Sequence, residues 1–172
     1  MNDASLFDRV PPHDDDAERA ALGGMLVSKD AIGEISQALD PEDFYQPNHQ
    51  TIYETILAMF SAGDPVDSVT VATKLDERGD LQKIGGVNYL HDLASEVPTA
   101  ANALYYAEIV HQRALLRRVI ATGTKITQLG YNAGGAQAQD VINLAQAEAY
   151  EMGEGKVHQD YVPLRDAVNT AL

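Results

Sequence analysis

Histidine and carboxylate side chains are the groups in this sequence best suited to catalysis or metal binding, but their spacing forms no known site. The five histidines are scattered: His13, His49, His91, His111 and His158. No two of them have the spacing that holds zinc on one face of a helix. Glu108 and His111 lie one helical turn apart, which more often gives a surface hydrogen bond than a metal pair. Because the chain has no cysteine, disulfides and thiolate zinc sites are excluded.

Other catalytic motifs are also absent from the sequence. The pairs Gly85-Gly86 and Gly134-Gly135 are not followed by Lys and then Ser or Thr, so they fit helix ends better than phosphate loops. The run Asp14–Asp16 fits a solvated helix N-terminus better than a metal site. His49 heads an apolar stripe, and we expect it to be partly buried with a backbone hydrogen bond. The residues therefore predict a binding module with no catalytic, cofactor or metal residues.

Composition narrows the class of partner. The net charge of −14, from 12 Lys and Arg against 26 Asp and Glu, argues against nucleic-acid binding by this chain alone. No apolar run approaches the roughly 20 residues that span a bilayer. The segment Met1–Asp16 is polar and has no signal-peptide core. We therefore expect a soluble, cytoplasmic protein with no membrane partner.

The spacing of apolar residues predicts an all-α fold that begins with a compact multi-helix head over residues 14–98, after a flexible tail over 1–13. Short amphipathic segments follow one another and are separated by Gly and Pro signals. Gly23-Gly24 lies inside the first helix, and close approach of another backbone is the best reason for it. In the last helix of the head we expect Val87, Leu90 and Leu93 on the buried side.

Residues 99–152 predict a long helical hairpin. Thr99 follows a proline and can cap the first arm, Gly134-Gly135 lies in the loop, and Asp140 suits the start of the return arm. Apolar residues recur along both arms at helical spacing: Ile109, Leu115, Leu116, Val119, Ile120, Ile126, Leu129, Val141, Leu144 and Met152. This apolar surface is wider than two helices need to cover each other, so part of it must meet another surface.

Residues 153–172 read as a linker followed by the start of another helix. Glycines at 153 and 155 interrupt the hairpin pattern, and an amphipathic run resumes from Val162. Because that pattern is still continuing at Leu172, we expect the sequence to end inside a longer protein.

Several local motifs occur in an order that resembles a known family. They are Val10-Pro11-Pro12-His13, Leu22-Gly23-Gly24, Pro41-Glu42-Asp43-Phe44-Tyr45, His49 with Ile52-Tyr53, Gly63-Asp64-Pro65-Val66-Asp67, Gly85-Gly86-Val87-Asn88-Tyr89-Leu90, Val97-Pro98-Thr99-Ala100-Ala101-Asn102 and Tyr106-Ala107-Glu108-Ile109-Val110. Each motif alone is weak, but the ordered series is specific. It resembles the N-terminal domain of the bacterial replicative DNA helicase, the DnaB family, over nearly the whole chain.

The resemblance implies a collar domain on a hexameric ring, in which hairpins pair between subunits as a trimer of dimers. DNA would be contacted only through the parent hexamer, and ATP and Mg would belong to a separate C-terminal motor domain. The segment from Val162 would contact the motor of a neighbouring subunit. The resemblance also implies docking of the helicase-binding domain of primase, for which we expect Tyr89, Ile120, Ile126, Arg117 and Arg118. The subunit interface would use Ile109, Leu115, Leu116, Val119, Val141, Leu144 and Met152.

Other interpretations stay open at this point. Ile126 is equally suited to sealing the hairpin seam, Tyr89 to an edge of the core, and the two arginines to a solvated face. The chain as a whole could instead be a free-standing helical dimerisation or regulatory module. An enzyme in its own right is the least supported alternative, and only the parent resembles an ATP-dependent helicase.

Overall fold

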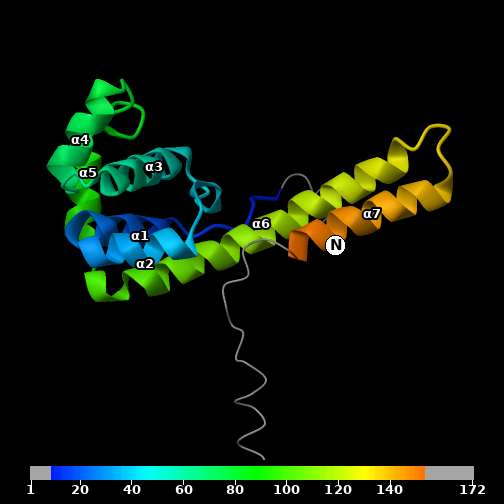
Figure 1. The fold of residues 1–172 in the computed structure, drawn as a ribbon, viewed down its shortest axis with the longest axis horizontal. Helices are drawn as coiled ribbons and strands as arrows, with labels where there is room; N and C mark the ends of the chain where they lie inside the picture. The colour runs from blue at the N-terminus through cyan, green and yellow to red at the C-terminus, as the bar shows by residue number, and fades with distance from the viewer. Residues whose placement is uncertain (1–8, 154–172) are drawn as a thin grey trace, which may run out of the picture. The chain divides into compact units, whose positions relative to one another are not determined.

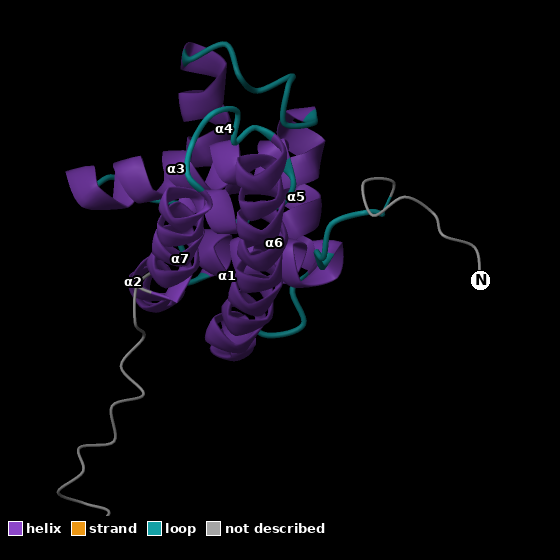
Figure 2. Ribbon diagram, turned by 90° about the vertical axis from the view of Figure 1, so that its right-hand side faces the viewer, coloured by secondary structure: helices purple, strands orange, loops and turns teal. Residues whose placement is uncertain are grey.

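A computed structural model describes residues 9–153, and every regular element in that range is a helix. Figures 1 and 2 show helices joined by short loops, which confirms the all-α prediction. The α-helices are α1 (Asp15–Val27), α2 (Lys29–Ala38), α3 (Pro47–Ala62), α4 (Ser68–Glu77), α5 (Gly86–Glu96), α6 (Ala103–Tyr131) and α7 (Ala138–Gly153). Two single turns of 3₁₀-helix complete the set, η2 (Pro41–Asp43) and η3 (Ala100–Asn102). The linker was predicted for residues 153–172. Gly153 is the last residue of α7, and the rest of that segment, with its helix from Val162, lies outside the described residues, as does most of the tail.

The chain divides into two compact units, Met1–Arg117 and Arg118–Leu172, which we call the head unit and the hairpin unit. The division falls inside α6, whereas the sequence placed the end of the head at residue 98. The first turns of α6 belong to the head because Ala103, Ala107 and Val110 are buried in its hydrophobic core.

Helix α1 is the centre of the head unit. It contacts α2, α3, α5 and η3, and each of its residues from Ala21 to Leu26 is buried. A Cβ atom on Gly23 would overlap the backbone oxygen of Leu93 in α5, and one on Gly24 would lie 2.6 Å from the Cβ of Ala103. The predicted close approach at this glycine pair is therefore confirmed, and it is what lets α5 and the start of α6 pack directly on α1.

Polar caps set the helix starts in the head. The Asp14 carboxylate accepts from the backbone N–H of Ala17 at 2.9 Å, which satisfies a free amide of α1. Asp67 accepts from the N–H groups of Val69 and Thr70 at 2.9 and 2.8 Å, and these bonds hold the pKa of its carboxyl below the ordinary value. Both aspartates thus act as N-caps.

Two local expectations are corrected by the structure. The Thr99 hydroxyl accepts from the N–H of Ala101, so it caps η3, and α6 begins only at Ala103. Val87, predicted on the buried side of α5, is 42% exposed. It sits in the first turn of α5, directly after two glycines with positive φ, and the helix turns its buried side inward only from Leu90 onward.

The hairpin unit contains the C-terminal part of α6 and all of α7. Their ribbons run side by side, joined by the loop at residues 132–137 (Figure 1), and the positive φ of Gly134 makes that turn. Helix α7 begins at Ala138, with Asp140 in its first turn. No residue of α7 is fully buried, in contrast to every α-helix of the head.

Candidate interaction surfaces

A buried chain of hydrogen bonds links three helices of the head. The carboxylate of Glu18 in α1 and the ring of His49 in α3 are 1% and 2% exposed. Glu18 Oε2 lies 2.5 Å from His49 Nδ1, and His49 Nε2 lies 2.6 Å from the hydroxyl oxygen of Tyr89 in α5. The backbone N–H groups of Tyr45 and Gln46 also donate to Glu18. A buried carboxylate is tolerated here because donors satisfy both of its oxygens.

The tyrosine at the end of this chain lies at the edge of the head. Tyr89 is half-buried, and the guanidinium carbon of Arg19 sits 5.2 Å from its ring centroid, in cation–π geometry. Arg19 also forms an ion pair with Glu96, and this bond raises the pKa of the arginine. Tyr89 therefore has the hydrogen-bonded hydroxyl expected of a tyrosine at the edge of a core, while part of its ring faces outward.

A second network surrounds the buried carboxylate of Asp43. Asp43 Oδ2 accepts from the N–H of Asp40 and lies 3.2 Å from His111 Nδ1. The Arg117 guanidinium donates to the carbonyl oxygens of Asp43 and Pro12, at 2.5 and 2.7 Å, and covers the ring of Tyr45. These contacts join the N-terminal segment, η2 and α6 within the head unit.

Two predictions about these polar residues need correction. His49 is fully buried and bonds to two side chains, whereas a partly buried ring with a backbone bond was expected. Arg117 does not lie on a solvated face, because its guanidinium is bound to two carbonyl groups. In both cases the partner is distant in sequence, so local spacing could not reveal it.

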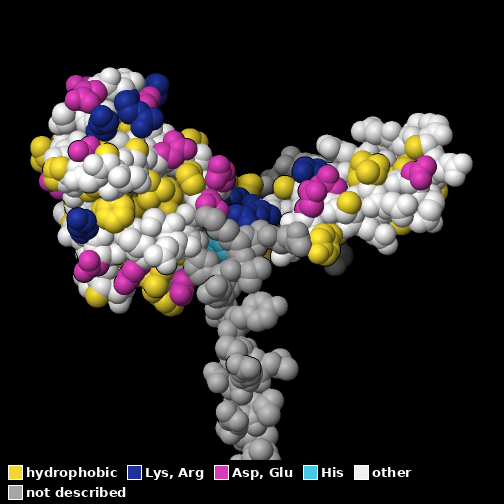
Figure 3. All heavy atoms as spheres, viewed as in Figure 1, with side chains coloured by type: hydrophobic (Ala, Val, Ile, Leu, Met, Phe, Trp, Pro, Cys, Tyr) yellow, Lys and Arg dark blue, Asp and Glu magenta, His cyan; other side chains and the backbone are white. Residues whose placement is uncertain are grey.

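The surface predicted to pair with other subunits is apolar and largely uncovered in the single chain. The exposed fractions are 46% for Leu116, 51% for Val119, 54% for Leu144 and 36% for Met152, while Leu115 and Val141 are half-buried. Of the residues predicted to dock primase, Ile120 is 52% exposed and Ile126 is half-buried. The prediction that the hairpin cannot cover its own apolar surface is confirmed. Figure 3 shows separate apolar side chains on the visible face of this unit, among uncharged atoms and a few charged groups.

Some of the predicted residues are gathered by the structure within each unit. In the hairpin unit, Val141 and Leu144 line one hollow together with Leu129. In the head unit, Ile109 lines a groove with Tyr106, Val97 and Pro98. Tyr89 and Arg117 belong to the head unit, whereas Arg118, Ile120 and Ile126 belong to the hairpin unit.

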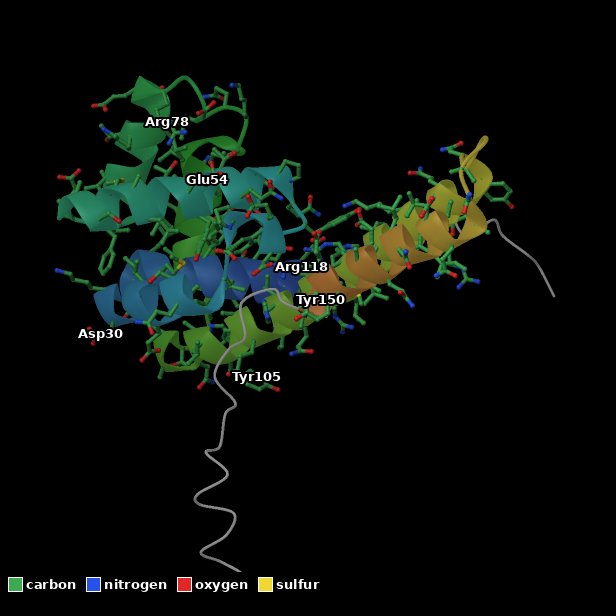
Figure 4. The ribbon with its side chains drawn as sticks, turned by 45° about the vertical axis from the view of Figure 1, so that its right-hand side comes forward. Asp30, Glu54, Arg78, Tyr105, Arg118 and Tyr150 are labelled. Carbon is green, nitrogen blue, oxygen red and sulfur yellow. The ribbon has the colours of Figure 1, made fainter. Side chains whose placement is uncertain are left out.

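Sequence reasoning overlooked several exposed aromatic and aliphatic residues. Ile142 and Tyr150 on α7 are 48% and 68% exposed, and Tyr105 near the start of α6 is 63% exposed (Figure 4). The signal for Tyr150 is its position on the side of α7 opposite Val141 and Ala145, whereas Tyr105 lies on the same face of α6 as Ile109 and Leu116. A large apolar residue on the polar face of a helix is a candidate for contact with another molecule.

Residues 9–153 contain no group of three or more His, Cys, Asp or Glu side chains placed to hold a metal ion. Within the same range, no helix combines the length and the apolar character required to cross a bilayer.

Comparison with known proteins gives a consistent result. Residues 10–112 match the family model described as the DnaB-like helicase N terminal domain. The chain is 50% identical over 167 residues to the replicative DNA helicase DnaB of Mycobacterium leprae, covering 96% of this chain but only 28% of that relative.

Two solved structures share the fold. The N-terminal domain of DnaB helicase from Mycobacterium tuberculosis has a TM-score of 0.76 and 52% identity, covering 83% of this chain and 99% of that one. A DnaB-like replicative helicase, described with its interactions with primase, has a TM-score of 0.68 and 25% identity over 92% of this chain and 36% of its own. The chain belongs to the family of DnaB-like helicase N-terminal domains.

Proposed function

We propose that this chain is the N-terminal self-association and primase-docking domain of a replicative DNA helicase. Its relative from Mycobacterium leprae is a replicative DNA helicase about three to four times its length, since the chain spans 28% of that protein. The observation that carries the proposal is the uncovered apolar surface of the hairpin unit. Contiguous apolar surface on a soluble domain marks a site of protein contact.

Self-association is the first part of the proposal. Val119 and Leu144 are more than half exposed although each lies on a helix of a two-helix unit, and α7 has no buried residue. Pairing with the hairpin of a second copy removes these side chains from water and stabilises both copies. In the parent protein, such pairs form the collar of a hexamer, and ATP and Mg act in a motor domain whose phosphate loop is absent from this sequence.

Light scattering over a range of concentrations tests self-association. We expect the mass of the wild-type chain to rise with concentration, and Val119→Asp with Leu144→Asp to hold it at the monomer value. Ala58→Asp combined with Val69→Asp, at exposed sites on α3 and α4, is the control with the same charge change. A strictly monomeric wild-type chain at high concentration contradicts this part of the proposal.

Primase docking is the second part. The solved DnaB-like helicase described with primase interactions shares 25% identity with this chain. Tyr89 and Ile120 are the residues proposed here to contact primase, and both present apolar surface on the outside of their units. Arg117 acts indirectly, since its guanidinium is bound within the head.

Titration with the isolated helicase-binding domain of primase tests docking. We expect Tyr89→Ala and Ile120→Asp each to weaken binding at least tenfold, the scale of an interface hot spot. Val69→Asp, at a site on α4 that is 61% exposed, is the control. Wild-type affinity in both test variants removes the docking assignment.

A further inference from the structure

Contacts from several neighbouring residues restrict the side chain of Tyr89. Its hydroxyl is 2.6 Å from His49 Nε2, and the two rings are nearly parallel, at 14° with centroids 6.1 Å apart. Arg19 covers the ring from α1 at 5.2 Å. On the side of its own helix, a Cβ atom on Gly85 would lie 3.1 Å from the Cβ of Tyr89, so Gly85 packs closely against the base of this side chain.

The hydrogen bond between Tyr89 and His49 depends on the buried carboxylate of Glu18. The Glu18 carboxylate accepts from the N–H of Tyr45 at 2.6 Å, and carboxylate oxygens only accept, so His49 Nδ1 donates to Glu18. When His49 is neutral, a proton on Nδ1 leaves Nε2 as an acceptor, and the Tyr89 hydroxyl donates to it. Buried residues of α1 and α3 thus determine both the position and the polarity of a side chain at the surface.

We infer that His49, which is 2% exposed and cannot itself touch a partner, is a positioning residue that holds Tyr89 in its docking rotamer before primase arrives. This inference rests on the docking function proposed above. A side chain already immobilised in the free protein does not lose rotamer entropy on binding, which saves a cost that otherwise weakens the complex. The Glu18–His49–Tyr89 chain is then part of the docking site even though only its last member reaches the surface.

The substitution Tyr89→Phe tests the inference most directly, because it keeps the ring and removes only the hydroxyl. We expect the affinity for the primase helicase-binding domain to fall roughly two- to tenfold, the range for one immobilised side chain. His49→Leu should cause a loss of the same size. The double variant should bind no more weakly than His49→Leu alone, because both changes break the same bond.

A stability control separates positioning from a general loss of folding. Ile56→Val lies on α3 like His49, is fully buried, and should lower the melting temperature without changing affinity. All affinities are measured on the complete 172-residue chain, at a temperature where each variant is folded. Losses that simply add in the double variant would overturn the inference, as would a loss in Ile56→Val that matches its loss of stability.

The failures of the two proposals are distinguishable. If Tyr89→Ala binds weakly while Tyr89→Phe binds like the wild type, the docking function stands and the positioning role of His49 is wrong. If Tyr89→Ala and Ile120→Asp both bind like the wild type, the docking function is wrong, and the positioning role that rests on it is wrong as well. Should His49→Leu not fold, the comparison of Tyr89→Phe with Tyr89→Ala still decides between these outcomes.

Discussion

The two units of this chain use similar apolar residues for opposite purposes. In the head unit many large apolar residues are enclosed in a core, in which Leu22, Ile52 and Leu90 are completely buried. In the hairpin unit, Val119, Ile120 and Leu144 are about half exposed in the single chain. The head therefore has its own hydrophobic core, whereas the hairpin leaves much of its apolar surface to contacts with other molecules. A core and an interface can have the same content of apolar residues. They differ in whether enough helices are present to cover those residues.

Truncating one leucine in each unit should give the largest difference in the free energy of unfolding between the head and the hairpin. Leu22→Ala should lower the free energy of unfolding by about 2–5 kcal/mol, because it leaves a cavity in a closed core. Leu144→Ala, at a site that is 54% exposed, should change it by no more than about 0.5 kcal/mol at monomeric concentrations. Urea unfolding measures both. Equal losses would show that the hairpin has a core of its own.

Substitutions at glycines of α1 and α2 test how closely the helices of the head pack. Gly23→Ala should destabilise the chain by about 1–3 kcal/mol, because the new methyl group overlaps the Leu93 backbone and cannot be accommodated by a rotamer change. Gly33→Ala on α2, where a Cβ atom meets nothing within 4 Å, should stabilise by about 0.5–1 kcal/mol. Melting temperatures of the two variants should thus move in opposite directions. A stabilising Gly23→Ala would mean that α5 does not approach as closely as described.

The cap of α4 provides a smaller, pH-dependent effect. Asp67→Ala should cost about 1 kcal/mol at neutral pH, because two N–H groups of α4 lose their acceptor. Hydrogen bonding lowers the pKa of this carboxyl in the folded state, so its stabilising effect is present above the unfolded value of 3.8 and is lost as the pH falls through the folded value. The gap between wild type and variant should narrow in acid unfolding curves. A gap that widens in acid would contradict the cap.

The smallest expected effect is in the hairpin. Lys125 in α6 and Glu148 in α7 form an ion pair at 3.3 Å, but the lysine side chain is 63% exposed. Lys125→Ala should therefore change stability by no more than about 0.5 kcal/mol, and less at high salt. Thermal unfolding at low and high salt measures the difference. A larger loss would show that polar contacts, and not partners, hold the two arms together.

The helical elements themselves were predictable from local chemistry. Apolar spacing and the signals of Asp14 and Gly134 predicted the start of the first helix and the loop of the hairpin to within a few residues. The close approach at Gly23-Gly24 was predictable too, because two glycines inside an amphipathic helix need a reason. These features depend on a few neighbouring residues, and short-range sterics and hydrogen bonding decide them.

The partners of the buried polar groups were decided only by the tertiary structure. Glu18 and His49 are separated by 31 residues, and Asp43 and His111 by 68, so no local pattern signals either pair. The same is true of Arg117, whose donors are bound by carbonyl groups from distant turns. A sequence determines which surfaces are apolar, since this depends on residue type and helical period. Which polar groups meet inside the core depends on how several helices pack at once, and only the folded chain brings them together.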